Sequence, residues 1–77
     1  MMTFCKRLRE VRMKRAFTQQ ALADAIGVAL RSYHCYEQGT REPSLSLLVA
    51  LADALEVPTD YLLCRDPAVV GSFDGYQ

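Results

Sequence analysis

Segments with apolar residues at helical spacing follow one another along this chain so closely that they leave no stretch for a strand. They cover five stretches, at about 3–15, 18–25, 30–38, 45–56 and 59–63. No six-residue stretch alternates apolar and polar residues with the β-branched enrichment of a strand. The connections are only two to five residues long, so we predict one all-α domain of five short helices.

Capping residues predict where these helices begin and end. Hydroxyl residues that can cap a helix with a side-chain oxygen precede four of the segments: Thr3, Thr18, Ser44 and Thr59. The first helix is predicted to stop near Ala16, and Pro58 is predicted to break the fourth. Gly27 and Gly39 come after the second and third segments, where a left-handed residue commonly ends a helix.

The apolar stripes of the helices predict which residues form the core. Leu8 and Val11 share one face of the first helix, and Leu62 faces inward from the fifth. Tyr33 occupies a core position on the third helix. The fourth helix carries the longest stripe: Leu45, Leu48, Leu51, Ala52 and Leu55. We predict a folded domain over residues 1–64, with a tail over 65–77 that is irregular, poorly ordered or part of a dimer contact.

The length and composition exclude several classes of protein. Seventy-seven residues leave no room for a catalytic domain with a pocket and a cofactor fold, and we expect neither enzymatic activity nor a cofactor. Cys5, Cys35 and Cys64 lack metal-ligand spacing and His34 is the only histidine, so we expect no metal site. No apolar run is long enough to span a membrane and the N-terminus does not have the form of a signal peptide, so a cytoplasmic location is expected.

The distribution of charge is uneven although the formal net charge is zero. Residues 1–41 hold eight basic and three acidic side chains, a net charge of +5, whereas residues 42–77 hold one basic and six acidic side chains, a net charge of −5. Such asymmetry indicates one face suited to an anionic partner on a molecule that is neutral as a whole. A solvated basic helix that binds no partner would give the same uneven distribution of charged residues.

The second and third segments, joined at Gly27, have the form of a helix-turn-helix unit, in which the second helix enters the major groove of DNA. The small side chain of Ala23 allows these two helices to pack closely. A larger set of residues extends in a fixed order and spacing over residues 4–63: Leu8, Arg12, Thr18-Gln19, Leu22-Ala23, Ile26-Gly27-Val28, Tyr36-Glu37, Gly39, Pro43-Ser44-Leu45, Leu48, Ala52, Leu55 and Val57. This set resembles the Cro/C1-type (XRE-family) helix-turn-helix domain of phage repressors. The resemblance implies a five-helix bundle of the lambda-repressor-like type that binds DNA, is commonly dimeric and regulates transcription.

Three positions depart from the pattern of that family. Ala29 stands where members usually cap the recognition helix with Ser or Thr, and this loss is worth about 0.5–2 kcal/mol. Ala16 stands where members often have Gly, and a left-handed conformation there would store about 1 kcal/mol of strain. Leu30 replaces the Gln, Arg or Lys that often begins the recognition helix.

Candidate contacts to DNA are suggested by the side-chain chemistry and by the resemblance. Arg31 is the leading candidate to read a base, because a guanidinium pairs bidentately with guanine. The predicted base contacts are Arg31, Leu30, Ser32, Cys35 and Gln19. The predicted phosphate contacts are Thr18, Gln19, Arg12, Lys14, Arg15, Gln38, Thr40 and Arg41. His34 is predicted to be a surface histidine on the recognition helix.

We predict a sequence-specific DNA-binding regulator, a repressor, that binds a palindromic operator in double-stranded DNA as a homodimer. A single helix-turn-helix reads too few base pairs for useful discrimination, which favours pairing. The predicted dimer surface is the fifth helix together with the residues after it: Leu62, Leu63, Val69, Val70 and Phe73. An alternative remains open, namely the antidote of a toxin–antidote pair or another protein-interaction module with weak or no DNA reading.

Overall fold

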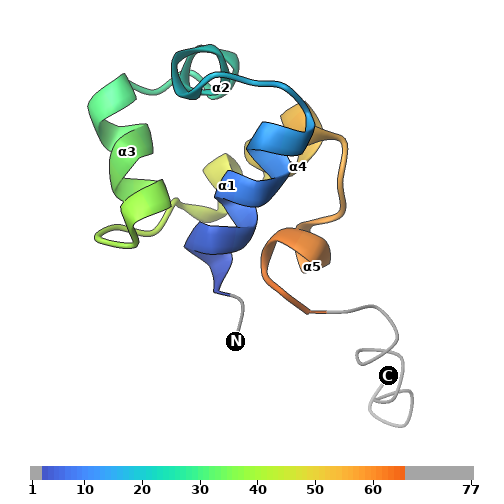
Figure 1. The fold of residues 1–77 in the computed structure, drawn as a ribbon. Coiled ribbons are helices and arrows are strands. Elements are labelled where there is room, and N and C mark those ends of the chain that lie inside the picture. The colour runs from blue at the N-terminus through green and yellow to red at the C-terminus, as the bar shows by residue number, and fades with distance from the viewer. Residues whose placement is uncertain (1–2, 66–77) are drawn as a thin grey trace, which may run out of the picture.

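Five α-helices and no strand make up residues 3–65, the part of the chain that the computed structural model describes (Figure 1). The helices are α1 (Phe4–Lys14), α2 (Gln19–Ile26), α3 (Leu30–Gln38), α4 (Leu45–Leu55) and α5 (Thr59–Leu62). The prediction of an all-α, five-helix fold is therefore confirmed. Among the described helices, none has the length and apolar character needed to cross a membrane.

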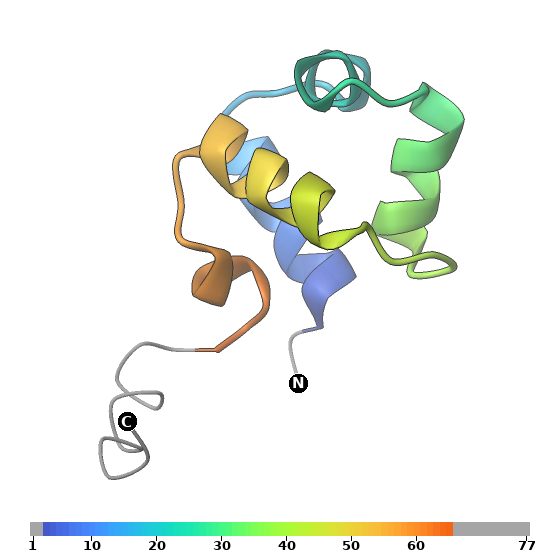
Figure 2. The ribbon, with the colours of Figure 1, turned by 180° about the vertical axis from the view of Figure 1, so that it is seen from behind.

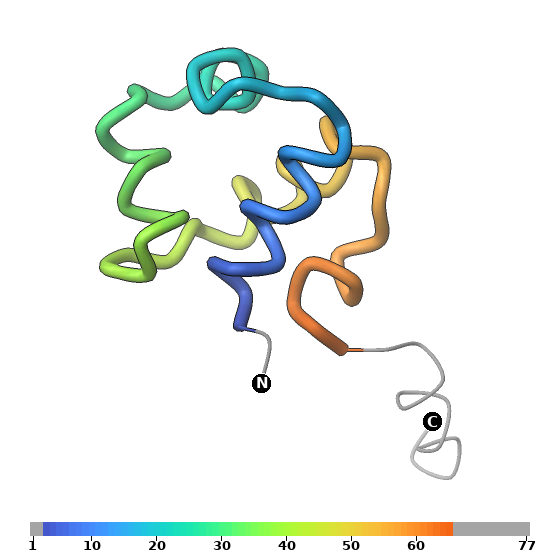
Figure 3. Tube along the Cα trace, in the orientation of Figure 1, coloured from blue at the N-terminus to red at the C-terminus, as the bar shows by residue number. Residues whose placement is uncertain are grey.

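The helices surround a single core, with α1 between α3 on one side and α5 on the other. The second helix lies across the top of the molecule in Figure 1 and contacts both α3 and α4. From behind, α4 crosses the face of the molecule from the loop after α3 towards α5 (Figure 2). The chain trace in Figure 3 shows how abruptly α2 gives way to α3, so that α3 lies at one flank of the bundle.

Every helix contributes side chains to the core, which explains how so short a chain encloses one. The buried residues are Leu8, Val11, Leu22, Ala23, Ile26, Tyr33, Tyr36, Leu51, Ala52, Leu55 and Leu62. Full burial of one such leucine is worth about 1.5–3 kcal/mol, so a few contacts of this kind stabilise each helix. The prediction that Tyr33 packs inside is confirmed, since its residue exposure is 0%.

Two apolar residues lie differently from their predicted roles. Leu45 was expected in the apolar stripe of α4, but it is 82% exposed: as the first residue of α4 it lines an open groove and is not enclosed by the core. Leu62 was predicted both to face inward and to lie on a dimer surface. The inward position is confirmed, because Leu62 is fully buried within its own chain, and this burial keeps it from a dimer surface, while its neighbour Leu63 is 41% exposed. Of the remaining residues of that predicted surface, Val69 and Val70 lie outside the described residues, as does Phe73. The predicted tail also lies outside them, apart from its first residue, Arg65.

Several predicted helix ends are confirmed. The side-chain oxygen of Thr18 accepts a hydrogen bond from the amide of Ala21 at 3.0 Å, and that of Ser44 accepts one from the amide of Leu47 at 3.3 Å. Gly27 is left-handed, with a φ of 78°. These bonds satisfy amides that a helix leaves without an internal partner, so the sequence placed these boundaries correctly.

Other helix ends differ from the prediction. Thr3 makes no capping bond with its side chain, whose hydroxyl lies 3.3 Å from the sulfur of Cys5 instead. Thr59 is the first residue of α5, and Pro58 occupies the capping position. The fourth helix ends before Pro58, because Glu56 adopts a left-handed conformation with a φ of 58°. Backbone hydrogen bonds that close the last turn hold this residue, which therefore ends the helix without a glycine.

Candidate nucleic-acid interface

The connection between α2 and α3 is a tight turn that starts at Gly27. Left-handed Gly27 donates its amide to the carbonyl of Asp24 at 3.2 Å, and Val28 donates to the carbonyl of Ala23 at 3.0 Å. The side chain of Ala23 is fully buried, as the close packing of the two helices requires. Only Val28 and Ala29 separate this turn from α3, so the first turn of α3 comes directly after it at the edge of the bundle (Figure 1).

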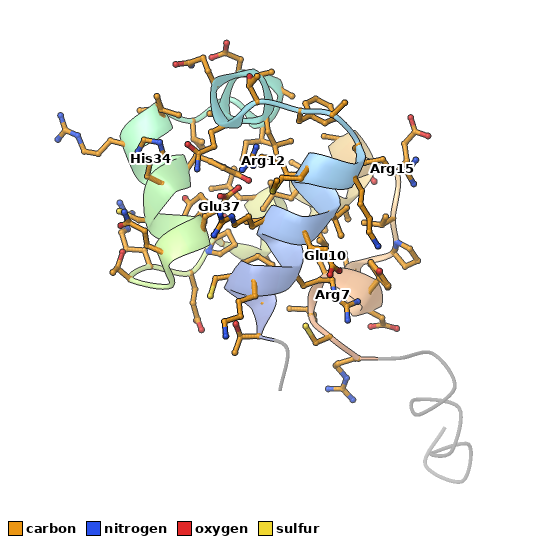
Figure 4. The ribbon with its side chains drawn as sticks, in the orientation of Figure 1. Arg7, Glu10, Arg12, Arg15, His34 and Glu37 are labelled. Atoms are coloured by element: carbon orange, nitrogen blue, oxygen red, sulfur yellow. The ribbon has the colours of Figure 1, made fainter. Side chains whose placement is uncertain are left out.

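A carboxylate from the far end of α3 joins this helix to α1 and α2. Glu37 accepts hydrogen bonds from Arg12 of α1, at 2.5 Å from Nε and 3.4 Å from Nη2. It also accepts one from the amide nitrogen of Gln19 at 3.0 Å, and one from the hydroxyl of Tyr33. Figure 4 shows Arg12 and Glu37 facing each other between the helices. The ion pair is largely buried, with 12% of the Arg12 side chain and 6% of the Glu37 side chain exposed.

The electrostatics of this cluster keep Glu37 ionised. Burial alone would raise the pKa of Glu37, but the hydrogen bonds from Arg12, Tyr33 and Gln19 outweigh it and lower the pKa below its ordinary value. The hydrogen bond to Glu37 raises the pKa of Arg12, against the opposing effect of burial. Burial, reinforced by the hydrogen bond to Glu37, also raises the pKa of Tyr33. The charges of the pair therefore persist throughout the neutral range.

The cluster continues towards the surface through Gln19. The oxygen of the Gln19 side chain lies 2.9 Å from Nε2 of His34, which is half-buried, whereas a surface histidine was expected. Figure 4 shows His34 directed from α3 towards this group. A polar hollow of about 320 Å³ opens beside it. The residues that line it are Arg9, Arg12, Gln19, His34, Glu37 and Gln38.

Three of the predicted base-contacting residues, Leu30, Arg31 and Ser32, begin α3, and Cys35 lies one turn further along the same helix. Arg31 is exposed and makes no hydrogen bond or ion pair with any described residue, while Leu30, Ser32 and Cys35 are half-buried. Gln19 lies at the start of the neighbouring helix and is held by Glu37 and His34. The base-reading roles themselves stay predictions. The predicted absence of a side-chain cap is confirmed, since Ala29 makes no such bond.

The predicted phosphate contacts divide into two groups. Four of them are exposed: Gln38, Thr40 and Arg41 at the end of α3 and in the loop after it, and Lys14 at the end of α1, where it lines a hollow with Arg15, Val57 and Tyr61. Thr18 is also exposed, with its hydroxyl capping α2. Gln19 is held by Glu37 and His34. The remaining two, Arg12 and Arg15, make contacts within the chain, and their phosphate contacts stay predictions. Arg15 donates to the carbonyl of Glu56 at 3.3 Å, on the flank of α1 away from α3 (Figure 4), and Arg12 is occupied by Glu37 and by the carbonyl of Phe17 at 2.9 Å.

Internal contacts also reduce the positive charge that the sequence offers to a partner. Arg7 donates to the carbonyl of Tyr61 at 3.1 Å, lies 4.1 Å from the centre of its ring, and approaches Glu10 at 3.6 Å. These contacts join α1 to α5, and no role was predicted for them. The exposed basic residues of the first 41 positions are Lys6, Arg9, Lys14, Arg15, Arg31 and Arg41, whereas Arg7 and Arg12 are partly buried.

The central role of Glu37 was missed by sequence reasoning, which placed it only in a family motif. A signal was present, because Arg12 and Glu37 each come four positions after a core residue on the same helix face. Two opposite charges on inward-facing positions suggest a buried pair. The two residues are twenty-five positions apart in the sequence, so the sequence does not show that they pair until the helices are packed. Within residues 3–65, no group of three His, Cys, Asp or Glu side chains could hold a metal ion.

Comparison with known proteins places this geometry in a family. A family model described as helix-turn-helix matches residues 8–62. The transcriptional regulator AnsR of Bacillus subtilis is 43% identical over 60 residues, which cover 78% of this chain and 52% of that protein. The cryptic phage CTXphi transcriptional repressor RstR of Vibrio cholerae is 48% identical over 48 residues, which cover 62% of this chain and 43% of that protein. This chain spans about half the length of the curated relatives it matches.

A solved structure is similar over most of the fold. The P22 c2 repressor, crystallised with a synthetic operator, superposes with a TM-score of 0.80 at 33% sequence identity. The alignment covers 86% of this chain and all of that one. The similarity therefore extends over the arrangement of the helices as well as the sequence motif.

Proposed function

This chain belongs to the Cro/C1-type helix-turn-helix family, and we propose that it is a sequence-specific DNA-binding transcriptional repressor that acts in the cytoplasm. One observation carries the proposal. The end of α3 is fixed to α1 and α2, while its start presents Arg31 to solvent with no partner in the described chain. Such a helix has a rigid base and an available reading surface, as insertion into a major groove requires. The P22 c2 repressor, bound to its operator, and the repressor RstR support this proposal.

Within this proposal, sequence is read by the first turns of α3. Arg31 pairs with a guanine, Leu30 contacts a thymine methyl group, and Ser32 and Cys35 line the same surface together with Gln19. The backbone of the DNA is held by Thr18 and Gln19 at the start of α2, by Gln38, Thr40 and Arg41 at the end of α3 and after it, and by Lys14 at the end of α1. Arg12 supports Gln19 through Glu37 and has no contact to DNA in this proposal.

Selection from a randomised pool of DNA duplexes tests the proposed function. Enrichment of one palindromic motif, with affinity that falls as salt is raised, is the expected result. A pool that shows no enriched motif would contradict it and would favour a protein-interaction module instead.

Two alanine variants then separate base reading from backbone holding. Arg31→Ala should cost about 1–3 kcal/mol on the enriched duplex and relax preference at one base pair per half-site, with little change on scrambled DNA. Arg41→Ala serves as the matched control, because it should weaken both duplexes alike and reduce the salt slope by about one. If Arg31→Ala weakens both duplexes equally, Arg31 holds phosphate and does not read a base.

The operator is proposed to be bound by a homodimer. An apolar groove of about 260 Å³ lies between the start of α1, the start of α4 and the end of α5, and its lining includes Phe4, Pro43, Leu45 and Leu63. Leu45 and Leu63 are 82% and 41% exposed, so the groove presents two apolar side chains to solvent. A second copy that covers this groove would remove both side chains from water.

Analytical ultracentrifugation of two charged variants tests the dimer. Leu45→Glu should shift the protein towards monomer, because a carboxylate in the covered groove would lose its hydration. Val49→Glu is the control, since Val49 is 50% exposed on the same helix but does not line the groove. Equal sedimentation of the two variants, or a wild-type monomer at high micromolar concentration with and without DNA, would contradict the proposed surface.

A further inference from the structure

The side-chain amide of Gln19 is held in one of its two possible orientations. An ionised carboxylate only accepts hydrogen bonds, so the group of Gln19 that lies 3.0 Å from Glu37 must be the NH₂ group. The reverse orientation would place two acceptor oxygens against each other beside a buried, paired charge. Glu37 therefore directs the oxygen of Gln19 away from itself and towards His34, at 2.9 Å from Nε2.

This orientation also fixes the protonation of His34. The Gln19 oxygen can only accept, so Nε2 of His34 must carry a proton. In the neutral imidazole, Nδ1 is then left as an acceptor; in the charged imidazole it becomes a second donor. Protonation of His34 therefore adds a positive charge and a donor without breaking the chain of hydrogen bonds from His34 through Gln19 to Glu37.

We infer that His34 is a positioning residue for Gln19 and that its protonation strengthens binding to the phosphate backbone of DNA, an inference that rests on the proposed function. The hollow beside His34 opens to solvent next to Gln19, the start of α2 and Gln38, which are proposed backbone contacts. A charged imidazole would offer a phosphate one more cationic donor at this place, and it would bind the Gln19 oxygen more strongly than a neutral one does.

The groups around His34 determine the sign of the effect. Arg9 and Arg12 line the hollow from α1, Gln19 from α2 is uncharged, and Glu37 lies one turn after His34 on α3. Glu37 is neutralised by its ion pair with Arg12, which leaves Arg9 and any added charge on His34 to face an anion. A phosphate in the hollow would therefore favour the protonated form of His34, so binding should tighten as the pH falls.

The tautomer is tested without DNA, by nitrogen NMR of the one imidazole in the chain. Neutral His34 is expected to carry its proton on Nε2, and a proton on Nδ1 would overturn the positioning of Gln19. Glu37→Gln is the matched variant, because its side-chain amide can also donate and so releases Gln19 from its fixed orientation. The two tautomers of His34 should then be more evenly populated; an unchanged tautomer would show that Glu37 does not orient Gln19.

The charge is tested by adding a mixed-sequence duplex to wild type and to His34→Gln at about pH 6 and at about pH 7.5. At the lower pH, wild type should lose about threefold more affinity between 50 mM and 200 mM salt than at the higher pH, as one added phosphate contact predicts. His34→Gln keeps a donor for Gln19 but cannot titrate, and should show the same salt dependence at both pH values.

Wild type that behaves like His34→Gln overturns the inference while the proposed function stands. A protein that binds no duplex at either pH overturns the proposed function and the pH effect together, and the NMR result still decides the orientation of Gln19.

Discussion

The two ends of α3 differ in almost every physical respect. Its last two turns hold the buried Tyr33 and Tyr36 and the carboxylate of Glu37, which is bound by three other side chains. Its first turn begins at Ala29 without a side-chain cap, and Arg31 there has no partner among the described residues. This domain therefore fixes its proposed reading helix from one end only. The first turn of α3, which would meet DNA, is therefore expected to contribute little to the stability of the domain, so its exposed residues can be substituted at little cost in unfolding free energy.

Removal of the anchor should have the largest effect of any change to α3. Glu37→Ala would leave the mostly buried Arg12 without its carboxylate and should cost about 3–5 kcal/mol in the free energy of unfolding. Urea denaturation measures this cost. Arg31→Ala, at the opposite end of the same helix, is the control and should change stability by less than about 0.5 kcal/mol. Similar losses of unfolding free energy in the two variants would show that the two ends of α3 do not differ in their contribution to stability.

Acid should weaken the anchored end selectively. The pKa of Glu37 is lowered in the folded protein, so its contribution to stability is complete above the ordinary carboxyl pKa and is lost as the pH falls through the folded value. The difference in unfolding free energy between wild type and Glu37→Gln should therefore shrink between about pH 6 and pH 3. Chemical denaturation at several pH values measures it, and a difference that stays constant would show that the carboxylate is not selectively ionised by the fold.

A side-chain cap at the first turn of α3 should stabilise this end of the helix and reduce the difference in stability between its two ends. Ala29→Thr supplies a hydroxyl that can accept a hydrogen bond from an unpaired amide of the first turn, and should raise the unfolding free energy by about 0.5–2 kcal/mol. Ala29→Val has the same shape without the acceptor, so it should give no such gain. A gain of equal size from both variants would assign the effect to packing instead of capping.

The smallest expected effect lies outside α3, at the end of α1. Ala16 is left-handed with a φ of 62°, so Ala16→Gly should stabilise the protein by about 0.5–1 kcal/mol through the release of backbone strain. Glu56→Gly is a matched variant at the end of α4, where φ is 58°, and should give a similar gain. Thermal unfolding measures both, and a lower melting temperature for Ala16→Gly would mean that the strain at this position is negligible.

Local features of the sequence predicted most of the fold. The capping hydroxyls of Thr18 and Ser44, the left-handed Gly27 and the missing cap at Ala29 all act over three or four residues, and each lies where it was predicted. The left-handed residues Glu56 and Cys64 were not predicted. Backbone hydrogen bonds hold them in this conformation, and their side chains give no indication of it in the sequence.

Short-range periodicity and turn chemistry were enough to predict the helices, most of their ends and most of the core from the sequence, and the family was predicted from the resemblance of the motif residues over positions 4–63. The charges that are available to a partner, in contrast, depend on how the helices pack. Arg7 and Arg12 belong to the same basic helix as Arg9, yet packing pairs them with α5 and α3, and Arg9 stays exposed. An ion pair such as that of Arg12 with Glu37 joins residues far apart along the chain, and its strength depends on separation and burial, which exist only once the helices have packed.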